Sequence, residues 1–201
     1  INMLQVCFDE AKCLDMTCDL IVGSGWPFGG EFLEPNERAQ IVVNYAEPVK
    51  GPTTLTIIRD SICAKAMPKV NSPYKGNTKE LILLRLYPNP ANAVDEGIDV
   101  LKSDSIFTID VPEGEFTLAA LVKINGFLEV INGAPGAAGP VLDHFNKDAV
   151  SKYLHNMSDK IEAQIGPLRD HIRALFTDSM ELEGANWTNN MAEEFQKRYD
   201  L

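Results

Sequence analysis

Long apolar runs and an excess of cationic side chains are both missing from this sequence. No stretch approaches the roughly 18–20 apolar residues that a helix needs to span a bilayer, so a membrane span is not expected. Lys and Arg number 18 against 29 Asp and Glu, which gives a formal net charge of −11. Binding to phosphates requires clustered Lys and Arg, so we expect no nucleic-acid partner.

Several motifs of common chemistries are also missing. The sequence contains no G-x-x-x-x-G-K-[ST] phosphate loop and no G-x-S-x-G nucleophile motif. It has no C-x-x-C pair and no histidine at zinc-ligand spacing, which argues against zinc in spite of four cysteines, Cys7, Cys13, Cys18 and Cys63. The 45% apolar and 23% charged residues are ordinary globular values. This composition fits a protein that handles neutral or cation-assisted ligands.

Both ends of the chain have the alternation of helices and strands that is typical of a parallel α/β sheet. Residues 2–13 have a helical period of apolar side chains, and residues 16–22 are strand-like and lead into a glycine-rich loop at 23–30. The alternation returns near Asn146, a good N-cap for a helix whose apolar stripe runs from Val150 to Ile161.

Three features follow that helix. Gly166 and Pro167 are expected to end it, and "IRALFT" at 172–177 is a candidate buried strand. A last helix is expected from about Thr188, with its apolar residues inward: Met191, Ala192, Phe195 and Tyr199.

The middle of the chain lacks helical periodicity and contains five strand-like runs. We expect it to form an antiparallel β insertion, in the manner of a small sandwich. Pro112, Glu113 and Gly114 separate the last two runs and are typical of a hairpin turn. The predicted segments are therefore 1–37, a β domain at 38–125, and 126–201.

The stretch "FTDSMELEGANWT", residues 176–188, places carboxylates directly after a strand, followed by an aromatic residue: Asp178, Glu181, Glu183 and Trp187. Catalytic residues of parallel α/β barrels lie at the carboxyl ends of strands, and glycoside hydrolysis needs two carboxyl groups, one of them a proton donor. A bulky aromatic side chain could raise the donor's pKa by desolvation. The alternative is an ordinary acidic loop in which Asp178 caps a helix.

Two further segments carry candidate binding residues. The loop "GSGWPFGG" presents Trp26 and Phe28, which could stack against a sugar or simply plug the rim of a barrel. "VLDHFNKDA" places Asp143 and His144 after an apolar pair, where both could reach a pocket or Asp143 could cap the next helix.

The stretches "LDMTCDLIVGSGWPFGG", "APGAAGPVLDHFNKDAV" and "IRALFTDSMELEGANWTNNMAEEFQKRYDL" together resemble the alpha-L-rhamnosidase-like glycoside hydrolases of family 106. The resemblance covers both ends of the chain and the β insertion only loosely. It implies an α/β fold made of incomplete (β/α)₈-type barrel segments with an inserted antiparallel β domain. It also implies an inverting enzyme that removes terminal rhamnose from polysaccharides.

The resemblance assigns residues as well. Glu181 matches the family's general acid, although members usually have an aromatic where Met180 stands. We expect Trp26, Asp143, His144, Asp178 and Trp187 to contact a rhamnose-containing glycan. The base is expected in a later strand outside this chain. Members often use calcium, for which the resemblance identifies no ligands here.

We therefore expect a fragment of a larger enzyme, inactive alone, whose native N-terminus precedes Ile1. The residues specify neither oligomeric state nor cellular location, and a periplasmic or cell-surface bacterial enzyme is our expectation. The alternative function is a non-catalytic carbohydrate-binding or scaffold module, with its binding site in the β block.

Overall fold

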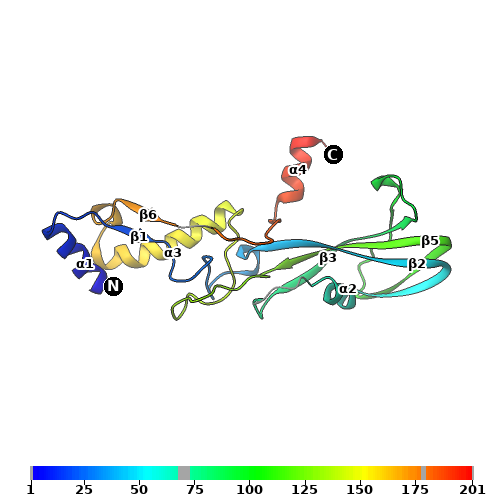
Figure 1. Cartoon of the computed structure of the whole chain (residues 1–201), viewed down its shortest axis with the longest axis horizontal. Helices are drawn as coiled ribbons and strands as arrows, with labels where there is room; N and C mark the ends of the chain where they lie inside the picture. The colour runs from blue at the N-terminus through cyan, green and yellow to red at the C-terminus, as the bar shows by residue number, and fades with distance from the viewer. Residues whose placement is uncertain (1, 68–72, 178–179, 201) are drawn as a thin grey trace. The chain divides into compact units, whose positions relative to one another are not determined.

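The computed structural model describes residues 2–67, 73–177 and 180–200 (Figure 1). The chain is a mixed α/β protein that divides into two compact units. Ile1–Ala39 and Leu128–Leu201 form the first unit, and Gln40–Phe127 form the second. Among the described residues, no helix is long and apolar enough to cross a membrane.

The first unit contains most of the helices and one pair of short strands. Its elements are α1 (Asn2–Cys13), β1 (Asp19–Ile21), η1 (Pro35–Glu37), α3 (Lys147–Ile165), η3 (Leu168–Asp170), β6 (Ala174–Phe176) and α4 (Met191–Tyr199). The predicted helix at 2–13 is confirmed, as are short strands within 16–22 and 172–177.

β1 and β6 lie side by side and run parallel, with Asp19 opposite Ala174 and Ile21 opposite Phe176 (Figure 1). The expectation that these two segments belong to one parallel sheet is confirmed. α3 lies between them in the chain, so β1, α3 and β6 form a βαβ unit. The loops that follow the two strands consequently leave the sheet at the same end.

The sequence determines both ends of α3 in the way predicted. The side chain of Asn146 accepts hydrogen bonds from the backbone N–H groups of Asp148 and Ala149, each at 3.1 Å. At the other end Gly166 has φ +85°, a conformation that favours glycine, and its N–H donates to the carbonyl of Glu162. The apolar stripe between these caps packs inward, with Tyr153 and Ile161 buried.

The loop that follows β1 is fixed by backbone pairing to the segment that leads into α3. Isolated antiparallel bridges join Trp26 to Ile131 and Gly29 to Val141. The glycines allow this close approach, because a Cβ atom on Gly29 would lie 2.1 Å from the carbonyl oxygen of Pro140.

The second unit contains a four-stranded antiparallel sheet in the order β2-β5-β3-β4. Its elements are β2 (Gln40–Ile58), α2 (Arg59–Lys65), β3 (Thr78–Pro88), η2 (Val94–Glu96), β4 (Ile98–Asp99) and β5 (Ile106–Asn125). The sandwich expectation is wrong for the described residues, which form a single sheet here. The sequence reading also missed α2, a short helix that packs on the sheet through Ile62 and Cys63.

The predicted hairpin turn at 112–114 is wrong as well. Pro112 to Gly114 lie within β5, which continues through them as β2 continues through Gly51 and Pro52. The register shifts between Gly51 and Thr53, so both strands pass through an irregularity instead of turning. Glycine and proline favour bulges as well as turns, so these residue types alone do not separate the two.

Two burial predictions are also corrected. The strand at 172–177 was expected to be buried, yet all three residues of β6 are exposed, because its only neighbour in the described sheet is β1. α4 was expected to turn its apolar residues inward, yet none of its residues is buried. The amphipathic period identifies the apolar face of a helix but not whether another element covers it.

Candidate active site

The end of the first unit toward which β1 and β6 point gathers the loops that carry the predicted site residues. These loops follow β1, precede α3 and follow β6. In parallel α/β proteins this end of the sheet carries the active site. Each predicted residue can therefore be placed relative to it.

Asp143 is the best-buried polar residue of this region, with 1% of its surface exposed. Its carboxylate accepts hydrogen bonds from Thr188 Oγ1 at 2.7 Å and from the Phe145 N–H at 3.0 Å. Its own N–H donates to the carbonyl of Glu37 at 2.8 Å. Burial raises the pKa of Asp143, while the hydrogen bonds from Thr188 and the backbone lower it. Asp143 thus joins three loops and supports the site from within the protein.

The carboxylate segment after β6 is held at both ends. β6 fixes its start, and the Thr188–Asp143 hydrogen bond fixes its end. Between these anchors Glu181 is exposed and adopts φ +41°, and Trp187 is half-buried. Asp178 lies outside the described residues. The structure thus places Glu181 on a loop at the end of the sheet expected for a catalytic residue.

His144 is half-buried beside Asp143. Its Nδ1 lies 2.8 Å from the carbonyl oxygen of Leu142, which can only accept, so Nδ1 carries the proton. Its Nε2 is buried and has no hydrogen-bond partner among the described residues. Burial lowers the pKa of His144, which keeps the ring neutral at pH 7. His144 is therefore a neutral ring with an unused acceptor.

The two aromatic side chains of the glycine-rich loop have different environments. Phe28 is buried in a core cluster with Val22 and Tyr153. Trp26 is half-buried and packs edge-on against Phe28, with ring centroids 4.7 Å apart. The two alternatives for this loop were packing within the protein and stacking against a sugar. Phe28 packs within the protein. The indole of Trp26 is partly exposed.

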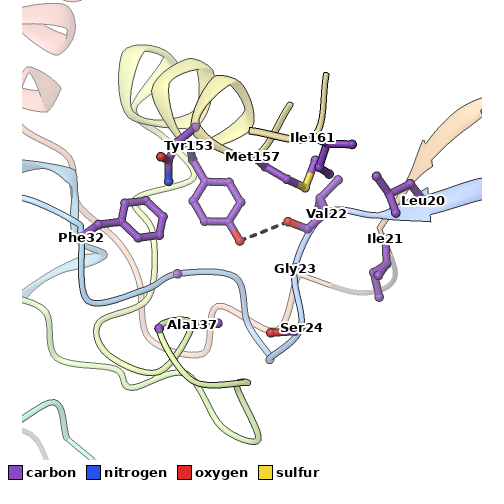
Figure 2. Close-up of a pocket in the computed structure, with 13 residues that line it drawn as sticks. Leu20, Ile21, Val22, Gly23, Ser24, Phe32, Ala137, Tyr153, Met157 and Ile161 are labelled. Atoms are coloured by element: carbon purple, nitrogen blue, oxygen red, sulfur yellow. Dashed lines mark hydrogen bonds between the residues drawn. The ribbon is translucent and has the colours of Figure 1, made fainter. Parts of the chain in front are cut away.

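A cavity of about 290 Å³ lies between β1 and its following loop on one side and α3 on the other (Figure 2). Figure 2 shows Tyr153 reaching from α3, its hydroxyl donating to the carbonyl of Val22 at 3.1 Å. Phe32 stacks on the Tyr153 ring, with centroids 5.8 Å apart. The residues that line this cavity do not include Glu181 or Trp26. Sequence reasoning treated Tyr153 only as part of an apolar stripe and missed the cavity.

A second, more polar groove of about 610 Å³ lies at the start of α3. Its walls include Asn36, Phe145, Asn146, Asn189 and Asn190. Sequence reasoning assigned no function to these residues. The available signal was the density of asparagines around the predicted start of two helices, which is also a common capping signal.

Calcium binding requires six to eight oxygen ligands, usually with several carboxylates. Among the described residues, no group of three or more His, Cys, Asp and Glu side chains could hold a metal ion. These residues therefore do not supply the carboxylate cluster that the expected calcium would require.

Comparison with known proteins identifies the family. The family described as alpha-L-rhamnosidase, glycoside hydrolase family 106, matches residues 86–201, more than half of the chain. The chain belongs to this family. The match includes Asp143, Glu181 and Trp187.

Among solved structures, this rhamnosidase-family chain is similar to the structure of a rhamnosidase from Novosphingobium sp. PP1Y. The TM-score is 0.54 at 13% sequence identity, and the alignment covers 96% of this chain and 34% of that one. The likeness supports a shared fold over about a third of the other protein's length. No curated protein matches the chain.

Proposed function

We propose that this chain is part of a glycoside hydrolase that removes terminal alpha-L-rhamnose from polysaccharides. The observation that carries the proposal is the family match over residues 86–201, which includes the carboxylate segment. The parallel β1–β6 pair supports it, because neighbouring strands of a (β/α)₈ barrel are parallel. In this proposal the first unit contributes part of such a barrel, and the second is an insertion in it.

Glu181 is the general acid in this proposal. It protonates the leaving oxygen while a second carboxylate, outside this chain, activates water on the opposite face of the sugar, so the anomeric configuration inverts. Its exposure and its place after β6 leave it accessible to a substrate. Trp26, Trp187 and His144 are the proposed sugar contacts. Asp143 supports them from within the protein.

The test uses the full-length polypeptide that carries this chain and the substitution Glu181→Gln. We expect kcat/KM on a natural rhamnoside to fall by about 10²–10⁴, the usual contribution of a general acid. Activity on an aryl rhamnoside with a good leaving group should fall far less, because that bond breaks without protonation.

Glu183→Gln is the matched control, since Glu183 is an exposed carboxylate two residues away. It should leave both activities within about threefold of the wild type. Proton NMR of the first product should show inversion. Equal losses of kcat/KM for Glu181→Gln on both substrates would contradict the acid role. If the full-length wild-type polypeptide bound rhamnosides without hydrolysing them, the carbohydrate-binding module would be favoured.

A further inference from the structure

The polar groove at the start of α3 lies at the end of the first unit where the loops after β1 and β6 emerge. It is built from three segments far apart in the sequence, around Asn36, Asn146 and Asn189. The side-chain amides of Asn146 and Asn189 both donate to the backbone carbonyl of Asn36, at 3.3 Å and 2.7 Å. The groove is therefore held together by a network of its own asparagines.

The buried carboxylate of Asp143 binds two of the segments that form the walls of this groove. It accepts from the N–H of Phe145 on one wall and from the hydroxyl of Thr188 on the other. Thr188 is only 6% exposed, and it directly precedes Asn189 and Asn190. A buried hydrogen-bonded carboxylate linking two walls gives the groove a defined shape before any ligand enters.

The groove also offers unused recognition groups. Within the part of the chain that the structure describes, the side-chain amides of Asn36 and Asn190 have no hydrogen-bond partner. Each amide offers both donors and an acceptor, the combination that sugar hydroxyls require. Phe145 adds an aromatic ring that is 54% exposed and therefore accessible to a ligand in the groove.

The charges of the groove favour an uncharged ligand over an anionic one. Lys147 and Lys152 are balanced by Glu37 and Asp148, and Lys152 already pairs with Glu37 at 2.6 Å. The side chain of Asn146 accepts from the N–H groups of Asp148 and Ala149, which leaves fewer N–H groups in the first turn of α3 for an anion. Neutral amides beside an exposed ring instead match an uncharged sugar, whose hydroxyls bind the amides while its C–H face packs on the ring.

We propose that this groove, lined by Asn36, Phe145, Asn189 and Asn190, is a binding subsite for an uncharged sugar unit of the substrate glycan. The ligand class rests on the proposed function, because a rhamnosidase acting on polysaccharides must hold sugars beyond the bond it cleaves. The subsite is distinct from the cavity beside Tyr153, with which it shares no lining residue. It assigns substrate contacts to residues that have no part in proton transfer.

The test measures binding by the 201-residue chain, with no turnover involved. The isotope-labelled protein is titrated with a neutral disaccharide of alpha-L-rhamnose on glucose, and separately with one of rhamnose on glucuronic acid. We expect weak binding of the neutral disaccharide, about millimolar, with NMR shifts concentrated at Phe145 and at the amides of Asn36, Asn189 and Asn190. The acidic disaccharide should bind less tightly.

The variants Phe145→Ala and Asn190→Ala remove side chains that are exposed, so neither should impair folding. We expect Phe145→Ala to weaken binding about tenfold and Asn190→Ala about threefold. Phe195→Ala and Asn92→Ala, which remove an equally exposed ring and an exposed amide outside the groove, should change nothing.

Absence of shifts at the groove, unchanged affinity in both groove variants, or tighter binding of the acidic disaccharide would overturn the proposal. Because the assay needs no hydrolysis, its failure is distinguishable from failure of the proposed function. The latter would appear as a full-length enzyme without rhamnosidase activity.

Discussion

Asp143 shows how one buried carboxylate sets the shape of a region and carries a cost for doing so. Burial disfavours its ionised form and raises its pKa. The folded chain therefore retains this proton to a higher pH than the unfolded chain does. The contribution of Asp143 to the free energy of unfolding is fully present below the pKa that Asp143 has in the unfolded chain. It decreases as pH rises through the pKa that Asp143 has in the folded chain.

The substitution Asp143→Asn removes this titration. We expect the wild type to lose stability relative to the variant as pH rises from about 4 to 7. Urea denaturation at several pH values measures the free energy of unfolding of both proteins. The difference between the two proteins at each pH removes the contribution of the other acids, which they share. If the wild type instead gained stability relative to Asp143→Asn over this pH range, the raised pKa of Asp143 would be contradicted.

The site residues differ in how far the sequence could predict them. The Asn146 cap was predictable because it bonds to residues two and three positions away. The supporting role of Asp143 was not, since its partner Thr188 lies 45 residues further along the chain. Both a capping and a pocket role had been open for Asp143, and local sequence does not separate either from a long-range hydrogen bond.

At the scale of the element, β5 shows a signal that was present and misinterpreted. Its buried side chains change parity: Phe107, Ile109 and Val111 are followed by Leu118, Ala120, Val122 and Ile124. One extra residue in a strand shifts the alternation by one, which keeps both runs on the same face of the sheet. A hairpin turn does not require the alternation of buried side chains to shift by one residue. The shift around Pro112 to Gly114 therefore favours a bulge.

Gly51, opposite this bulge, provides the test at this scale. A Cβ atom there would lie 1.7 Å from the carbonyl oxygen of Pro112, closer than any real contact. We expect Gly51→Ala to lower the free energy of unfolding by about 1–3 kcal/mol, because the two backbones must move apart. Chemical denaturation followed by circular dichroism measures the loss.

Lys50→Ala is the control, since Lys50 is the exposed neighbour of Gly51 in β2. It should change the free energy of unfolding by less than about 0.5 kcal/mol. Equal stability of Gly51→Ala and the wild type would show that the strands do not approach as described.

At the scale of the molecule, the sequence predicted the alternation of α1, β1, α3, β6 and α4, but not how much of their apolar surface is covered. Phe176 of β6 and Phe195 of α4 are about half exposed. Periodicity records which side chains are apolar, whereas burial depends on neighbours that local sequence does not contain. The two-stranded sheet explains why the predicted buried strand is exposed here.

The same small sheet bears on whether the 201-residue chain can act alone. Inverting hydrolysis needs an acid and a base about 6.5–9.5 Å apart on opposite faces of the sugar. In our proposal Glu181 supplies the acid from the loop after β6, and the base belongs to a strand outside this chain. The chain also aligns with only 34% of the rhamnosidase of known structure.

We therefore expect the purified chain to release no aryl leaving group from an alpha-L-rhamnoside above the rate of buffer. The full-length polypeptide, assayed under identical conditions, is the positive control. Since a good leaving group needs no acid, the substrate isolates the missing base: the chain should stay inactive even where Glu181→Gln in the full-length protein retains activity. Turnover of this substrate by the 201 residues above the rate of buffer would contradict this, because the base would then lie within the chain.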